Sequence, residues 1–175
     1  MAAAECRIIV DLADRERASA WISIGDRVMG GRSSGALQPG DGAAVFEGRV
    51  SVENGGGFAS VRSPPGRFDL GGAEGIALRV RGDGRTYRLS LRTDPELDGV
   101  SYQAPFPTPP GRWIDLRLPF SAFAARFRGR EVSAAPLDPR RIASFGLLVG
   151  EGQQGPFRLE VAWIGSYREP RAGEP

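Results

Sequence analysis

The side chains that could carry out chemistry are few, because the chain has no histidine and all 23 of its basic residues are arginines. Histidine-dependent triads and lysine Schiff bases are therefore excluded. One cysteine without histidine cannot form a zinc site. The remaining acid–base candidates are carboxylates: Glu47, Glu53, Asp94, Glu96 and Asp98. Nothing in their spacing brings two together as a glycosidase requires, so we expect no catalytic residue, no enzyme activity and no cofactor.

The stretch from Gly150 to Gly155 matches the spacing G-x-G-x-x-G of dinucleotide-binding loops. Such a loop must open a helix within a βαβ unit. Here Pro156 and the strand-like run F-R-L-E-V-A-W-I follow instead. We therefore interpret this stretch as a hairpin turn and expect no nucleotide there.

Arginine is concentrated in the middle of the chain, where residues 76–130 hold ten arginines and five acidic residues. Several occupy outward positions of strands that we expect to be neighbours, which would create one basic sheet face able to receive an acidic protein surface, a phosphate-bearing ligand or RNA. Tyr87 has the apolar parity and offers no stacking platform, so no nucleic acid is expected. The alternative is a solvated face in a protein without lysine. The candidate binding face comprises Arg79, Arg88, Arg92, Tyr102, Gln103 and Arg117, and Arg81 shares their outward parity.

Period-2 alternation is the main structural signal, and it predicts an all-β antiparallel sandwich. It is clearest at residues 75–81 and 86–92, where apolar and polar side chains alternate strictly. Further strands are expected at residues 7–12, 21–24, 33–37, 43–52, 57–62, 100–104, 113–118, 144–149 and 157–166. We expect one helical turn within residues 14–20 and a short helix within residues 119–130, capped by Ser121 and ending at Gly129. Residues 5–168 should form a single domain, followed by a frayed tail at 169–175.

Two glycine clusters, in M-G-G-R-S-S-G and N-G-G-G, lie between the early strands. Glycine accepts positive φ, so we predict a tight strand reversal at each cluster. The candidate motif turn consists of Asp26, Gly30, Gly31 and Ser33. We expect the side chains of Asp26 and of Ser33 or Ser34 to bond backbone amides there, as such residues do in turns.

Several sequence blocks occur in one order along the chain: W…D…V-M-G-G-x-S, F-x-G-x-V-S and N-G-G-G-F-A-S-V-R within residues 21–62, G-D-G-R-T-Y-R-L-S-L-R-T at 82–93, W-I-D-L-R-L-P-F-S-A-F at 113–123, F-R-G-R at 127–130, I-A-S-F-G at 142–146 and the run that starts at Gly155. Together they resemble the NADH:ubiquinone oxidoreductase (complex I) intermediate-associated protein 30 family.

This resemblance implies a jelly roll of the galactose-binding-domain-like type. It also implies a non-catalytic binding module, an assembly factor or chaperone-like protein for respiratory complex I or another complex, with a protein as its partner. The alternative is a carbohydrate-binding jelly roll that uses Tyr102, Arg88 and Gln103, with Tyr102 as the exposed ring that stacks on a sugar. Some relatives of this fold hold a structural calcium, to which Asp11, Asp14 or Glu160 could contribute; its presence stays open.

The remaining features indicate a soluble intracellular protein. Cys6 is the only cysteine, which excludes an internal disulfide, and its apolar run predicts a buried, inert thiol. Trp21, Trp113 and Trp163 are expected to fill the core. No run approaches 18 apolar residues and no secretory signal is visible, so we expect a cytoplasmic protein without a transmembrane segment.

Overall fold

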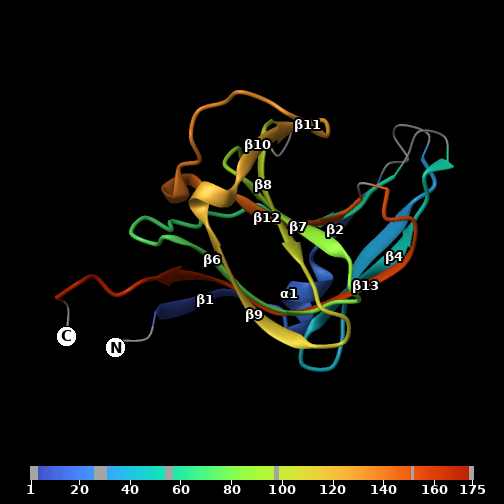
Figure 1. Cartoon of the computed structure of the whole chain (residues 1–175), viewed down its shortest axis with the longest axis horizontal. Coiled ribbons are helices and arrows are strands. Elements are labelled where there is room, and N and C mark those ends of the chain that lie inside the picture. Colours follow the sequence, from blue (N-terminus) through green and yellow to red (C-terminus); the bar gives the residue numbers. More distant parts are fainter. Residues whose placement is uncertain (1–3, 26–30, 54–56, 97–98, 151, 174–175) are drawn as a thin grey trace.

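Two antiparallel sheets pack face to face in a computed structural model that describes residues 4–25, 31–53, 57–96, 99–150 and 152–173 (Figure 1). The six-stranded sheet A has the order β3-β4-β13-β6-β9, with β1 also paired to β13. The seven-stranded sheet B has the order β11-β10-β8-β7-β12-β5-β2. The predicted all-β sandwich is confirmed.

The strands of sheet A are β1 (Glu5–Asp11), β3 (Ser34–Pro39), β4 (Ala44–Val50), β6 (Gly75–Arg81), β9 (Trp113–Pro119) and β13 (Gly155–Arg168). Those of sheet B are β2 (Ile22–Gly25), β5 (Ala59–Arg62), β7 (Thr86–Arg92), β8 (Ser101–Pro107), β10 (Ala124–Phe127), β11 (Arg130–Glu131) and β12 (Ser144–Val149). The described helical segments are short: α1 (Arg15–Ser19), η3 (Phe120–Ala122) and η4 (Pro139–Arg141). The helical turn expected within residues 14–20 is confirmed as α1, whose N-cap is Asp14.

The core lies between the sheets because each alternating run turns its apolar side inward. At its centre, four aromatic rings join the two sheets: Phe46 and Phe157 from sheet A, and Tyr87 and Phe106 from sheet B. The Phe46 and Phe157 centroids are 4.8 Å apart, and the Tyr87 ring stacks on Phe106 at 6.1 Å. Between the sheets, the Tyr87 ring lies 6.4 Å from both Phe46 and Phe157, in edge-to-face contacts that join the two sheets.

Tyr87 should make the free energy of unfolding depend on pH in the alkaline range. Its hydroxyl donates a hydrogen bond to Asp83 Oδ1 at 3.0 Å. Burial raises the pKa of the Tyr87 phenol, and the Asp83 charge and their hydrogen bond raise it further. The folded state therefore keeps a proton that the unfolded chain loses above about pH 10, so the free energy of unfolding should fall as the pH rises past that value.

We expect urea titrations between about pH 8 and about pH 11 to show this loss in the wild type and a shallower loss in Tyr87→Phe. The phenylalanine ring keeps the packing and removes the titrating group. Equal slopes in both proteins would contradict a role for Tyr87 in the alkaline loss.

The glycine clusters carry the chain from one sheet to the other. M-G-G-R-S-S-G connects β2 in sheet B with β3 in sheet A, and N-G-G-G connects β4 in sheet A with β5 in sheet B. The G-x-G-x-x-G stretch likewise joins β12 to β13 across the sandwich. The strands on either side of each stretch therefore do not pair as a hairpin, because alternation identifies a strand without saying which sheet it joins. The predicted turns include residues 29–30, 54–56 and 151, which lie outside the described residues. Asp26 and Gly30 of the motif turn lie outside the described residues, and Gly31 is buried.

Ser33, which directly precedes β3, is hydrogen-bonded to the residue that follows β4. Its hydroxyl accepts a hydrogen bond from the Ser51 amide at 2.9 Å and donates one to the Ser51 carbonyl at 3.1 Å. The side chain is buried, with 1% of its surface exposed. Ser33 therefore bonds a backbone amide, but this amide lies 18 residues away and outside the predicted turn.

Ser33→Ala should lower the free energy of unfolding by about 1–3 kcal/mol, because it leaves the Ser51 amide and carbonyl without this partner. Urea denaturation measures the loss. Ser34→Ala is the control, since Ser34 is the exposed neighbour. A Ser33→Ala protein as stable as the control would show that water replaces both bonds.

The helix predicted within residues 119–130 is wrong. Only η3 forms there, and Ala124–Arg126 then pair with Ser101–Gln103 at the edge of sheet B. The spacing of Phe120 and Phe123 suits a helical turn, but the open edge of β8 supplies ladder partners for the residues that follow. A tight turn through Arg128 and Gly129, with φ of 50° and 78°, then leads into β11.

Three other core assignments change in the structure. Cys6 is exposed on β1, so the buried thiol predicted from its apolar run is wrong. Trp113 and Trp163 are half-buried, whereas Trp21 is a core residue as predicted. The Trp113 ring contacts the guanidinium groups of Arg79 and Arg81, at 5.4 and 5.1 Å from its centroid. In the part of the chain that the structure describes, no helix is long and apolar enough to span a membrane.

Candidate functional site

The residues predicted to share one binding face are divided between the two sheets. Arg79 on β6 and Arg117 on β9 belong to sheet A. Arg88, Arg92, Tyr102 and Gln103 lie on β7 and β8 of sheet B. The prediction of a single basic face is wrong, because β6 and β7 follow one another in sequence but pair with different strands.

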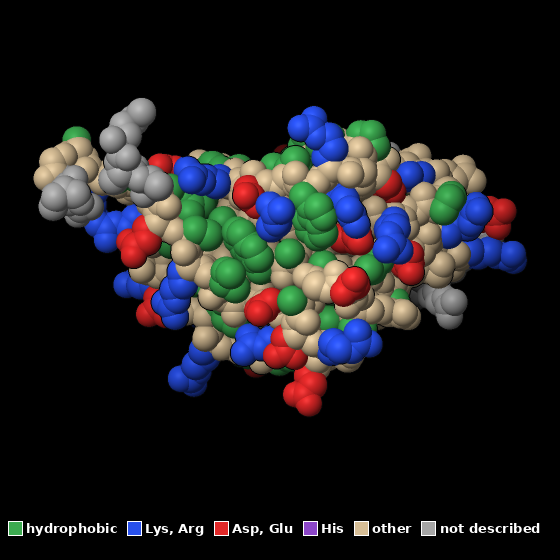
Figure 2. Space-filling model, turned by 90° about the horizontal axis from the view of Figure 1, so that it is seen from below, with side chains coloured by type: hydrophobic (Ala, Val, Ile, Leu, Met, Phe, Trp, Pro, Cys, Tyr) green, Lys and Arg blue, Asp and Glu red, His purple; other side chains and the backbone are tan. Residues whose placement is uncertain are grey.

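Three arginines on the outer side of sheet A are matched by carboxylates. Arg79 pairs with Asp115 at 3.0 Å and Arg117 with Glu169 at 2.8 Å, and Arg81 bonds Glu160. Figure 2 shows this side of the molecule, where positive and negative side chains are intermixed around apolar ones. Exposed pairs of this kind add little stability. This side fits the interpretation of a solvated surface in a protein without lysine.

Tyr102 is a core residue, contrary to the prediction of an exposed ring. Only 8% of its surface is exposed, and its hydroxyl donates to the Ala135 carbonyl at 2.7 Å. Ser101 and Gln103 share the opposite parity, so strand geometry turns the tyrosine between them inward. The ring is therefore not available to stack on a sugar.

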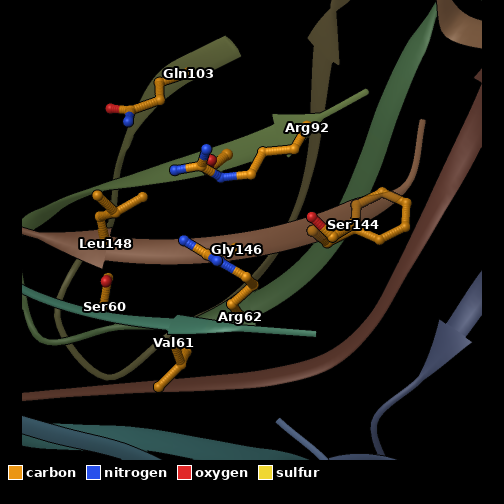
Figure 3. A pocket seen from close by; sticks show the side chains of 10 residues that line it. Ser60, Val61, Arg62, Arg92, Gln103, Ser144, Gly146 and Leu148 are labelled. Carbon is orange, nitrogen blue, oxygen red and sulfur yellow. The ribbon is translucent and has the colours of Figure 1, made fainter. Parts of the chain in front are cut away.

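The outer side of sheet B holds a small hollow built on one cross-strand row. Arg62 on β5 pairs with Gly146 on β12, Gly146 with Ser90 on β7, and Ser90 with Gln103 on β8. Figure 3 shows the hollow from close by. Its lining residues are Ser60, Val61, Arg62, Ser90, Arg92, Gln103, Ser144, Phe145, Gly146 and Leu148.

Gly146 leaves the space for this hollow. A Cβ there would lie 3.2 Å from the Val61 carbonyl oxygen and 3.3 Å from the Ser90 Cβ. Ser90 and Ser144 point outward by register, yet only 7% and 1% of their surfaces are exposed. The hollow measures about 40 Å³, well below the roughly 300–1,000 Å³ of enclosed ligand pockets. It can serve as one subsite of an open binding surface.

The electrostatics of the hollow come from two arginines on either side of β12. Figure 3 shows the Arg62 side chain reaching from β5 over β12, while the Arg92 side chain runs along β7. Burial lowers the pKa of the Arg62 guanidinium, the Arg92 charge lowers it further, and Asp94 opposes both effects. Arg92 also donates to the Gly99 carbonyl at 2.7 Å, and Asp94 accepts from the Gly99 amide at 3.0 Å. Two cations that act on each other favour a nearby anion, and the Asp94 carboxylate is one such charge.

Sequence reasoning found Arg88, Arg92 and Gln103 of this surface but missed the residues on β5 and β12. Those missed are Ser60, Arg62, Ser144, Gly146 and Leu148. A signal was present: Arg62 closes the block N-G-G-G-F-A-S-V-R, and Gly146 closes I-A-S-F-G. These two blocks and the one at 82–93 meet at the hollow, although they are far apart in sequence.

The structure gives no support to a calcium site among the residues it describes. They contain no group of three or more carboxylate, cysteine or histidine side chains placed to hold a metal ion. Of the carboxylates considered, Glu160 is bonded by Arg81, and Arg158 lies 3.5 Å from it. Asp14 caps α1.

Solved structures with a similar fold include carbohydrate-binding modules. The family 11 module of a Clostridium thermocellum cellulosomal cellulase matches with a TM-score of 0.69 at 16% identity, covering 99% of this chain and 100% of that one. A family 29 module matches with a TM-score of 0.56 at 9% identity, covering 95% and 90% of the two chains. These likenesses confirm a jelly roll of the galactose-binding-like type and, at this identity, show the fold alone.

Sequence comparison identifies relatives of another kind. Complex I intermediate-associated protein 30, mitochondrial, of Mus musculus is 28% identical over 95% of this chain and 57% of its own length. The Drosophila melanogaster protein of that name is 26% identical over 95% of this chain and 64% of its length. This chain thus spans about three fifths of the relatives it matches. The family model described as Complex I intermediate-associated protein 30 matches residues 10–161, and the chain therefore belongs to that family.

Proposed function

We propose that this chain is a non-catalytic protein-binding module, an assembly factor for respiratory complex I or another protein complex, and that it holds its partner on the outer face of sheet B. The family membership supports the assembly role. The observation that carries the choice of face is the hollow on the outer side of sheet B, around which arginine, serine and amide groups gather.

The composition of this face suits a protein partner. Its polar groups, on Arg62, Arg92 and Gln103, can donate hydrogen bonds to backbone carbonyls and carboxylates. Apolar contact is available beside them, because Leu148 lines the hollow and Ile22, at the edge of the same sheet, is 55% exposed. Arginine is enriched among the residues that dominate protein interfaces.

A carbohydrate ligand is the alternative, and it rests on the fold. One of the similar solved structures is a family 11 module in complex with a β-1,3-1,4-mixed-linked tetrasaccharide. In this chain the ring proposed to stack on a sugar belongs to Tyr102, which is buried in the core. The observations therefore favour a protein partner over a sugar.

Site-specific photo-crosslinking in the native cells tests the proposal. A photoreactive amino acid replaces Gln103 in the hollow or, as the control, Asp115 on the outer side of sheet A. We expect the Gln103 position to crosslink subunits or assembly intermediates of one complex, identified by mass spectrometry, and the Asp115 position to give none of them.

Equal crosslinking from both positions, or none from Gln103, would contradict the proposed face. Calorimetric titration with the mixed-linked tetrasaccharide separates the alternatives. Binding of the sugar that is lost in a Gln103→Ala variant would favour the carbohydrate function over the assembly role.

A further inference from the structure

We propose that the hollow between Arg62 and Arg92 receives a carboxylate side chain from an acidic segment of the partner protein. This inference rests on the proposed function and names the chemistry of the partner. Three observations carry it: the converging guanidinium groups, the floor of hydroxyl and amide groups, and the space left by Gly146.

The two guanidinium groups supply directed charge. Arg62 and Arg92 lie on the two strands that flank β12, and Arg62 reaches over β12 while Arg92 runs along β7. An anion held between the two side chains would contact both guanidinium groups. Guanidinium groups present paired N–H donors that match the two oxygens of a carboxylate. The Arg92 charge lowers the stability of the Arg62 charge, and an anion near both guanidinium groups would be attracted by each of them.

The floor of the hollow adds neutral donors. The Ser90 and Ser144 side chains lie on β7 and β12, and the Gln103 amide lies on β8 beside them. The Gln103 amide nitrogen already donates to the Ser101 hydroxyl at 3.0 Å, which fixes the orientation of the amide. Donor groups that are fixed before binding cost less entropy when the ligand arrives.

The size of the hollow selects a small group. Glycine within a strand often marks a place where another group approaches the backbone closely, and Gly146 is such a residue. The 40 Å³ of the hollow corresponds to roughly one water-sized group. This volume admits the end of an aspartate or glutamate side chain, while the rest of the segment lies on the open face.

Charge complementarity extends beyond the hollow and decides the class of partner. Arg88 and Arg126 occupy outward positions on β7 and β10. Together with Arg62 and Arg92, they place four arginines on this side of sheet B. RNA would also be attracted, but single-stranded recognition relies on aromatic stacking. The rings of Tyr87 and Tyr102 on the central strands are both in the core. An acidic protein segment is the occupant that these observations favour.

Fluorescence anisotropy of a labelled short oligoglutamate peptide, titrated with the full chain, tests the inference. The variant R62Q/R92Q removes both charges and keeps amide donors of similar reach. The matched control R79Q/R117Q removes the same charge from the outer side of sheet A. We expect R62Q/R92Q to weaken binding by about 10-fold or more, since charge-assisted hydrogen bonds are lost, and the control to change it less than about 2-fold. Thermal melts confirm that both variants are folded.

A third variant, Gly146→Ala, places a methyl group in the hollow without changing any charge. Its expected effect is also weaker peptide binding, by about 3-fold or more, through lost space. Equal weakening by the two double variants would overturn the inference, since binding would then follow net charge. No binding of oligoglutamate by the wild type would overturn it as well. Displacement of the peptide by inorganic phosphate or oligothymidylate at lower concentration than by free oligoglutamate would assign the hollow to phosphate instead.

The crosslinking experiment separates this inference from the proposed function. If the R62Q/R92Q chain still crosslinks the same partner through position 103, the partner is bound without these arginines, and only the carboxylate inference fails. If the wild type crosslinks no protein yet binds oligoglutamate at the hollow, the anion subsite stands and the assembly role fails.

Discussion

Gly48→Ala is expected to lower the free energy of unfolding by about 3 kcal/mol, through a clash that no side-chain movement can relieve. Gly48 lies on β4 opposite Gly35 on β3. A Cβ at Gly48 would lie 2.0 Å from the Ser34 carbonyl oxygen and 2.7 Å from the Gly35 Cα. Both atoms belong to the backbone of β3, so that strand must move away from β4 and give up part of its ladder.

Urea denaturation of the variant measures this loss. Gly42→Ala is the control, because it lies in the turn of the same hairpin, where a Cβ meets no atom within 4 Å. Its φ of 71° still makes alanine unfavourable, by about 1 kcal/mol. Similar losses in the two variants would mean that β3 yields easily, and would remove the clash as the cause.

Phe46→Ala is expected to cost about 3–5 kcal/mol, because it empties the contact between the two sheets. The Phe46 side chain is fully buried on β4, and its ring lies 4.8 Å from Phe157 and 6.4 Å from Tyr87. Removing it takes away a partner of both sheets at once, and the surrounding rings can only partly fill the space.

The same denaturation series should include Phe46→Leu, which keeps most of the buried volume and loses the edge-to-face ring contacts. We expect it to cost less than half as much as Phe46→Ala. A leucine variant as unstable as the alanine variant would place the loss in the aromatic contacts and not in the cavity.

The fold class was predictable because alternation is a local property. Residues 75–81 and 86–92 were expected as strands with their apolar side inward, and they form β6 and β7 with those sides in the core. Which strands pair is a different question. β6 and β7 are joined by a short connection and still belong to opposite sheets, because a jelly roll passes repeatedly between its sheets. No periodicity within either strand contains that information.

The candidate site was only partly predictable for the same reason. The outward parity of Arg88 and Arg92 was read correctly, but their neighbours on the surface come from β5 and β12, which lie far away in sequence. Tyr102 was misplaced although its own pattern was informative, since a ring between two outward polar residues must point inward. Gly146 illustrates what a sequence conceals, because the importance of a missing side chain appears only when the facing strands are known.

The position of β13 has a consequence for how the protein is made. It is the final strand in chain order, yet it lies in the middle of sheet A, bonded to β4 and β6, with β1 paired along its second half. On the ribosome, those earlier strands emerge with unpaired edges that remain open until β13 has been synthesised. Exposed edges of this kind invite pairing with other chains. The sandwich would therefore pass through a vulnerable interval during synthesis, which ends when β13 leaves the ribosome and pairs with them.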